Sequence, residues 1–498
     1  MSETQGKTQT RQSNDRQPGY PAVVAGTNGD HLGDLMRWLL PNDDIFADIK
    51  FHGNAKWRAS DLVVHALSWA MSESKNVTDA FDQTQAFADS VATSRSHSTY
   101  QGLMYILEKW TGPLLKSLWP VLHQRMREVG RNRWFKVFGF VPIAFDGSRS
   151  SAPRTESNEQ KLCAPNYGKG QTAQYRKKKT KGMRRKRNEK NKAQPQKPQA
   201  WITLTWHMGL RLPWMWKLGP SNASERGHVM EMLEEGDFPS ETLFCGDAGF
   251  VGYPLWSCII DKGYEFLVRV GANVNLLAKT LGCYTEIVDG IVYCWPNEAQ
   301  RTELPPLRLR LVRVKIGGQN MWMLTSVLSP KSLSRKRIAE LYRLRWGIEV
   351  EFRGLKQTMD RGELRCRNSK RVLAELNWSI MAMAVAELFA LKEQLAPRKR
   401  VRPKSSPPPN PKKRSLANTV RAIRNCLVHP SAKPKPGKDL RSRLQTALTD
   451  SYRRRKPKRA RYRPPNPDKK PLGNPEIRQM THEEKKKLNA YEKAQNAA

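Results

Sequence analysis

Three carboxylates along the chain, Asp146, Asp247 and Glu349, have neighbours that suit work on phosphate esters. Asp146 follows the apolar run FKVFGFVPIAF and Asp247 follows LFCG, so each is expected where a buried strand ends. Carboxylate oxygens are the ligands that Mg²⁺ or Mn²⁺ prefers, and two such ions about 4 Å apart can activate an attacking oxygen and stabilise a leaving one. The three residues therefore predict a two-metal site for phosphodiester cleavage.

The third carboxylate lies in Ser334–Lys356, a segment that is predicted to form one helix. Four of its side chains suit a phosphate site: Tyr342, Arg345, Glu349 and Lys356. At about 100° per residue these four share an arc of roughly 60°. The two cations would contact phosphates beside the metals, and the tyrosine would fix a phosphate by a hydrogen bond. The alternative is a solvated face with helical ion pairs, but apolar and aromatic residues crowd the segment.

The spacing Y-x2-R-x3-E-x6-K matches the YREK signature of a group of bacterial insertion-sequence transposases, so the chain resembles these DDE transposases over about residues 137–395. Asp146 in FDGS is similar to the family's first catalytic Asp, and Asp247 in FCGDAGF to the second. The resemblance implies an RNase H-like α/β fold, a mixed sheet interrupted by a β-rich insertion. It also implies that Asp146, Asp247 and Glu349 are the catalytic metal ligands, with Tyr342, Arg345 and Lys356 as DNA phosphate contacts.

The same resemblance implies cut-and-paste transposition with two Mg²⁺ (or Mn²⁺) ions in each active site. Water attacks the transposon end, the freed 3′-hydroxyl attacks the other strand, and the ends are joined to target DNA. The expected partners are transposon-end DNA, target DNA and a second copy of the chain in a synaptic complex. Family members stack a flipped base on a Trp of the insertion; Trp322 lies nearby, but Met321 falls in the matching register, so no stacking residue is assigned.

The net charge of the chain independently favours a nucleic-acid partner. Lys and Arg number 87 against 46 Asp and Glu, a formal charge of +41, and phosphate neutralisation would release counterions. A ribosomal or chromatin-like protein has the same composition.

Seven scattered cysteines include no C-x-x-C pair, which argues against a structural zinc site and for reduced thiols. The N-terminus has no signal-peptide pattern. The longest apolar stretch is Leu373–Leu391, and polar residues interrupt it. We therefore expect a cytoplasmic, nucleoid-associated bacterial protein without membrane contact.

Changes in composition divide the chain into six predicted segments. They are a disordered N-terminus (1–30), an α-helical domain for DNA-end binding (31–133), the first part of the catalytic core (134–270) with a basic loop (171–199), a β-rich insertion (271–330), the last core helices (331–395) and a basic, Pro-rich, disordered tail (396–498) with one helix at Leu416–Leu427. The helical domain could instead serve packing alone. The loop and the tail could track DNA or be merely solvated.

Two other functions remain open at this stage. An RNase H-like nuclease or resolvase without strand transfer would use the same three carboxylates, although Arg345 and Lys356 have no obvious use in a simple nuclease. A catalytically inactive, basic DNA-binding protein would require the acidic triad to be inert. His228, one helical turn after Glu225, is more typical of a structural or surface residue than of a catalytic one.

Overall fold

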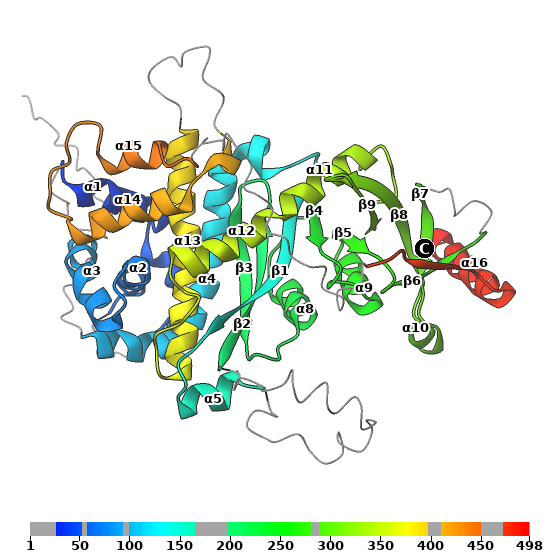
Figure 1. Ribbon diagram of the computed structural model, residues 1–498, viewed down its shortest axis with the longest axis horizontal. Helices are drawn as coiled ribbons and strands as arrows, with labels where there is room; N and C mark the ends of the chain where they lie inside the picture. Colours follow the sequence, from blue (N-terminus) through cyan, green and yellow to red (C-terminus); the bar gives the residue numbers. More distant parts are fainter. Residues whose placement is uncertain are drawn as a thin grey trace, which may run out of the picture.

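The computed structural model describes residues 26–51, 57–92, 99–164, 197–280, 288–396, 410–449 and 472–497. The predictions for residues 1–25, for most of the basic loop (171–196) and for parts of the tail (397–409 and 450–471) lie outside the described residues. The described part has a mixed α/β architecture, with a helical body at one end and a large sheet that extends away from it (Figure 1).

In chain order the described helices are α1 (Asn28–Leu39), η1 (Asp43–Phe46), α2 (Ala59–Met71), α3 (Val77–Val91), α4 (Tyr100–Phe135), α5 (Glu156–Leu162), α8 (Glu225–Glu235), α9 (Tyr253–Asp261), α10 (Asn297–Arg301), α11 (Arg335–Arg345), α12 (Gly347–Arg353), η2 (Gly354–Thr358), α13 (Ser369–Leu395), η3 (Pro411–Lys413), α14 (Leu416–Val428), α15 (Leu440–Gln445) and α16 (His482–Ala497). The strands are β1 (Val141–Ser151), β2 (Gln199–His207), β3 (Leu212–Gly219), β4 (Thr242–Gly246), β5 (Glu265–Val270), β6 (Asn275–Ala278), β7 (Asp289–Cys294), β8 (Leu307–Ile316), β9 (Gln319–Thr325) and β10 (Glu476–Gln479).

The long helix α13 is the centre of the helical body. It packs against α2, α4 and α14 (Figure 1). Its apolar side chains are buried around nearly the whole circumference. It is also the described helix that is long and apolar enough to cross a membrane, but 89% of that window is buried inside the protein. A helix that is apolar all round is expected at the centre of a helical core, so this burial explains its composition. The N-terminal helices and the last core helices therefore share one core.

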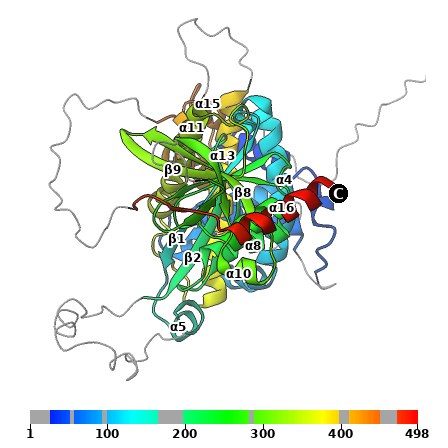
Figure 2. The ribbon, with the colours of Figure 1, turned by 90° about the vertical axis from the view of Figure 1, so that its right-hand side faces the viewer.

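The tail departs from the prediction of disorder. Helices α14 and α15 pack against α13, and Ile423, Leu427 and Leu444 are fully buried. Strand β10 pairs with β6 at the end of the sheet away from the helical body, and helix α16 lies at the same end (Figure 1); Figure 2 looks at this end, with α16 in front. Helix α14 confirms the helix predicted at Leu416–Leu427, whereas the prediction of disorder is wrong for the other described residues of 410–449 and for 472–497. The reason is that a few apolar residues at helical spacing decide packing, even where Pro, Lys and Arg dominate the average composition.

All ten described strands form one sheet, in the order β10-β6-β7-β8-β9-β5-β4-β1-β2-β3. Strands β1, β4 and β5 are parallel neighbours, whereas β1, β2 and β3 pair in antiparallel fashion. Strand β9 pairs with β5, so the β-rich residues 271–330 continue the sheet rather than form a separate unit. Helices α8 and α12 both contact β1.

Candidate active site

The strand register places Asp146 next to Asp247. The last parallel pair of β1 and β4 is Ala144 with Cys245, and both aspartates lie two residues beyond that pair. Asp146 was predicted to end its strand, but it lies in the middle of β1, because β2 remains paired with β1 as far as Ser151. Asp146 and Asp247 therefore come together where β1 and β4 stop pairing, and β1 itself continues beyond this point.

The segment that carries Glu349 is helical, as predicted, but it is divided into three parts. Helix α11 begins at the N-cap Ser334, whose hydroxyl accepts a hydrogen bond from the backbone N–H of Arg337. Trp346 separates α11 from α12, and the last turn, Gly354–Thr358, is a π-helix. Trp346 keeps right-handed helical angles (φ −53°, ψ −17°), so the axis continues and the predicted face is largely preserved.

Arg345 lies between the first and third carboxylates. Its Nη1 is 3.6 Å from Oδ2 of Asp146, and its Nη2 donates a hydrogen bond of 3.2 Å to Oε1 of Glu349. The side chain is only 7% exposed, and its Nε and Nη1 have no hydrogen-bond partner among the described residues. The guanidinium thus supplies positive charge between two carboxylates, while its Nε and Nη1 donors remain without a hydrogen bond.

The other two predicted phosphate contacts occupy different positions. Tyr342 is buried, and its ring lies 5.4 Å from the Arg345 guanidinium carbon, so it packs on that side chain. Lys356 lines a surface pocket of about 330 Å³ together with two of the carboxylates. The residues that line this pocket are Asp146, Gly147, Ser148, Glu349, Phe352, Arg353, Lys356 and Gln357. Burial lowers the pKa of the Lys356 ammonium and raises that of the Tyr342 hydroxyl.

The electrostatics of the site are dominated by Asp146. Burial raises the pKa of this carboxyl to about 6, against the lowering effects of the Gly147 N–H and of Arg345, and the charges of Asp247 and Glu349 raise it further. Asp247 accepts a hydrogen bond of 2.8 Å from the backbone N–H of Gly249. The Asp146 carboxyl is therefore protonated more readily than a free aspartate.

The donor set fits a hard divalent cation, because it consists of carboxylate oxygens at a surface pocket. Across the described ranges, no group of three or more His, Cys, Asp or Glu side chains is arranged to hold an ion. Arg345 pairs with both Asp146 and Glu349, so its guanidinium supplies positive charge between these two carboxylates.

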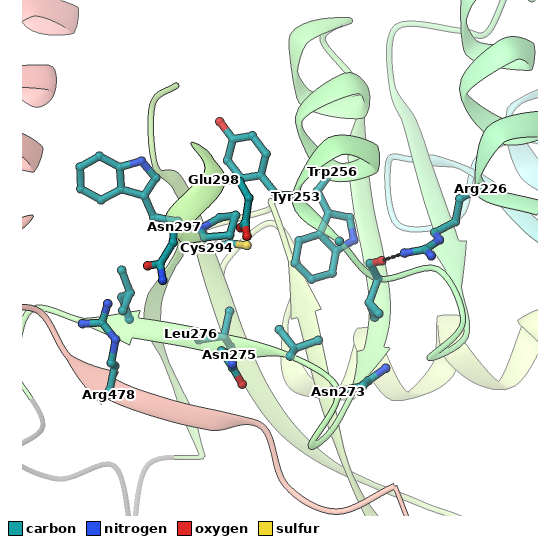
Figure 3. Close-up of a pocket in the computed structure, with 16 residues that line it drawn as sticks. Arg226, Tyr253, Trp256, Asn273, Asn275, Leu276, Cys294, Asn297, Glu298 and Arg478 are labelled. Atoms are coloured by element: carbon teal, nitrogen blue, oxygen red, sulfur yellow. Dashed lines mark hydrogen bonds between the residues drawn. The ribbon is translucent and has the colours of Figure 1, made fainter. Parts of the chain in front are cut away.

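Two side chains that the sequence did not single out hold the loop after Asp247. Nη1 of Arg226 donates a hydrogen bond of 2.8 Å to the carbonyl oxygen of Val251. Nδ2 of Asn273 donates one of 2.9 Å to the carbonyl oxygen of Ala248. Both residues line a pocket between α9, β6 and β10, shown in Figure 3. No sequence motif marks them, because their partners are backbone atoms.

A third residue that the sequence did not connect with the site is Glu225, the first residue of α8. Its carboxylate lies directly over Gly147, and its charge interacts with those of Asp146 and Asp247. His228, which the sequence placed near it, is buried, and its Nδ1 pairs with the hydroxyl of Thr203 at 2.9 Å. His228 is thus a buried residue with a structural contact, which agrees with its interpretation as a structural residue.

Comparisons with known proteins give a match to a family model over part of the chain and a distant similarity to a solved structure. Residues 142–385 match the family model of the transposase DDE domain, and this span includes all six predicted site residues. No curated protein matches the chain. Among solved structures, the cryo-EM structure of a piggyBac transposase synaptic complex with hairpin DNA is similar with a TM-score of 0.39 and 11% identity, over 87% of this chain and 88% of that chain. A similarity of this strength carries no argument about the site.

Proposed function

We propose that the protein is a DDE transposase of the bacterial insertion-sequence type, which cleaves transposon DNA ends and transfers them into target DNA. The observation that carries the proposal is the register of β1 and β4, which brings Asp146 beside Asp247, with Glu349 linked to Asp146 through Arg345. The match of residues 142–385 to the transposase DDE domain supports the same reaction class.

In this proposal Asp146, Asp247 and Glu349 hold two Mg²⁺ or Mn²⁺ ions. Such ions, when bound, activate the attacking oxygen and stabilise the leaving oxygen of a phosphodiester. Lys356 and Arg353 line the pocket beside the carboxylates and would contact the DNA phosphates there. Arg345 would exchange its carboxylate partners for a phosphate, and Tyr342, packed on its guanidinium, would orient it.

The same proposal covers the architecture. Strands β3, β2, β1, β4 and β5, with α8 and α9, would form an RNase H-like core, since three antiparallel strands are followed by two parallel ones. Residues 271–330 would be the β-rich insertion, and the helices within 31–133 would contact DNA ends. The formal charge of +41 suits a homodimer that binds two transposon ends and target DNA.

The test is strand cleavage and joining on labelled DNA that carries the element's terminal repeats, with Mg²⁺ or Mn²⁺. Glu349→Ala should lower cleavage by on the order of 10⁴-fold, as removal of other indispensable catalytic groups does, while a gel shift with the same DNA persists. Glu340→Ala, on α11 outside the pocket, is the matched control and should cleave normally.

Three results would count against the proposal in different ways. Full activity of Glu349→Ala would remove Glu349 from the metal site. Nicking without joining by the unmodified protein would indicate a nuclease or resolvase. Binding without any cleavage, in either metal, would indicate a DNA-binding protein whose carboxylates are inert.

A further inference from the structure

The turn of the chain that carries Lys356 is a π-helix, Gly354–Thr358, which directly follows α12. The backbone N–H of Met359 closes it by donating to the carbonyl oxygen of Gly354, five residues earlier, at 3.0 Å. Turns of this kind are rare and are frequently found at functional sites. The position of Lys356 therefore depends on the contacts that hold this turn.

The ammonium group of Lys356 has no partner of its own to fix it. Among the residues that the structure places, no hydrogen bond or ion pair involves this side chain, although it lines the pocket with Asp146 and Glu349. A lysine has a flexible four-carbon stem, so its reach toward a phosphate depends mainly on where the backbone places its Cα. Contacts that fix the backbone of the π-turn therefore also direct Lys356.

Helix α14 contacts the beginning of the π-turn through its first residue, Leu416. A Cβ added to Gly354 would lie 2.5 Å from Cδ2 of Leu416, so the leucine side chain occupies the space beside the glycine. Leu416 is partly buried and packs against the hydrophobic core. Because Gly354 has no side chain, Leu416 reaches the backbone at the point where α12 passes into the π-turn.

The same helix contacts the end of the π-turn through Arg424. Its Nη2 donates a hydrogen bond of 3.4 Å to the carbonyl oxygen of Thr358, the last residue of the turn. Its Nε donates one of 2.7 Å to the carbonyl oxygen of Met71, the last residue of α2. The last carbonyls of a helix have no partner within that helix, so an arginine is well suited to this position. Arg424 thus joins α14 and α2 to the π-turn.

A second arginine connects α2 with the residue after the turn. Arg361 donates from Nη2 to the carbonyl oxygen of Ala70 at 3.2 Å and from Nη1 to that of Met359 at 2.7 Å. Arg361 is buried and pairs with the buried Glu375, so its removal would disturb the core itself. Arg424 is partly exposed and is therefore the better residue to change.

We propose that Leu416 and Arg424 are positioning residues for Lys356: α14 contacts both ends of the π-turn and so determines where the ammonium group meets a DNA phosphate. The inference rests on the proposed function, in which Lys356 contacts the DNA beside the carboxylates. It gives a helix that follows the catalytic core in the chain a part in the reaction. Through Arg424, α2 of the N-terminal helices bears on the same turn.

The first test measures strand cleavage of labelled terminal-repeat DNA with Mg²⁺. Arg424→Met loses the bond to Thr358 and should cleave on the order of 10²-fold more slowly, as displacement of a group by about 1 Å can cause. Lys356→Ala should be at least as slow, and the variant with both changes no slower than Lys356→Ala, since both act through one group. Arg421→Met, at an exposed position of α14 that bonds Asn418, is the matched control and should cleave normally.

The second test uses a substitution that changes no charge. Leu416→Ala should lower the slope of log affinity for the same DNA against log salt concentration by about one, because one phosphate contact is lost. Lys356→Ala should lower the slope equally, and the two changes together no further. Val428→Ala trims an exposed apolar side chain at the other end of α14 and should keep the slope. Thermal unfolding would confirm that each variant is folded at the assay temperature, and a leucine that only stabilises the fold would leave the slope unchanged.

The outcomes distinguish this inference from the proposed function. If the effects of Arg424→Met and Lys356→Ala on cleavage add, and Leu416→Ala keeps the salt dependence, α14 only stabilises the fold and the transposase proposal stands. If Lys356→Ala itself cleaves normally and keeps the salt dependence, Lys356 contacts no phosphate, and the role of α14 falls with it.

Discussion

At the scale of single residues, Asp146 is held in an environment that disfavours its charge. Its side chain is 19% exposed and burial raises the pKa to about 6. Arg345 opposes this effect, but Asp247 and Glu349 reinforce it. In the proposed metal site, a bound cation would stabilise the charged form of this buried carboxylate.

This environment predicts how stability depends on pH. A carboxyl with a raised folded-state pKa stabilises the protein fully below its unfolded-state pKa, near 4, and that contribution is lost as the pH rises through about 6. Asp146→Asn avoids the loss. Without metal, it should therefore gain stability over the unmodified protein by on the order of 2 kcal/mol between pH 4 and pH 7.

Thermal unfolding at several pH values would measure this difference. Asp82→Asn, at an exposed position on α3, is a control that should show no such pH-dependent gain. A stability difference between Asp146→Asn and the unmodified protein that stays constant from pH 4 to pH 7 would refute the environment described for Asp146.

At the scale of elements, α12 packs against the sheet on one side and contacts the helical body on the other. Glu349 faces the pocket, whereas Glu351, two residues later, is buried beside Glu387 of α13. Burial and the neighbouring Glu387 raise the pKa of Glu351. Arg414, ahead of α14, pairs with Glu387 at 3.1 Å, so the C-terminal region contacts the part of α13 that packs beside α12.

The contact of α12 with the sheet depends on Gly347. A Cβ added there would lie 2.1 Å from Cη2 of Trp206, a fully buried ring of β2. Gly347→Ala should therefore lower stability by about 1–3 kcal/mol, because a rigid ring or the helix must move. Cleavage should fall further than the loss of folded protein explains, since Glu349 moves with the helix.

A glycine in open space provides the comparison. Gly112 is an exposed position of α4 with no atom within 4 Å of an added Cβ, so Gly112→Ala should raise stability by about 0.5–1 kcal/mol. Urea unfolding together with the cleavage assay would measure both variants. Equal stability and activity of Gly347→Ala and the unmodified protein would show that α12 is not held against Trp206.

At the scale of the whole molecule, the sequence predicted elements well and their mutual placement poorly. Apolar runs and caps predicted most strands and helices, including α8 from Ser224 to Gly236. The carboxylate of Glu225 lies over Gly147, the neighbour of Asp146 in the chain, because of the tertiary path of α8, which no local pattern encodes. The tail was mispredicted because Leu488 and a few other apolar residues are hidden in a basic composition.

The C-terminal segment, residues 472–497, adds the edge strand β10 to the sheet. Strand β10 pairs in parallel with β6, and Met480 and Leu488 are buried against the sheet. Around them, Lys279 pairs with Glu492 at 2.9 Å and Gln300 donates to Glu484 at 2.9 Å. The Lys279–Glu492 pair is partly exposed and contributes little, so the buried apolar side chains provide most of the docking energy.

Leu488→Asp should therefore release the segment, since an unpaired charge would replace a buried apolar side chain at a cost of several kcal/mol. Amide hydrogen exchange of β6 should rise at least about 10-fold, because its outer edge loses β10, whereas β1 and β4 should keep their protection. Asn489→Asp introduces the same charge at the exposed neighbouring position and should leave exchange unchanged. Unaltered protection of β6 in Leu488→Asp would mean that β10 does not hold this edge in solution, and that the sheet ends at β6.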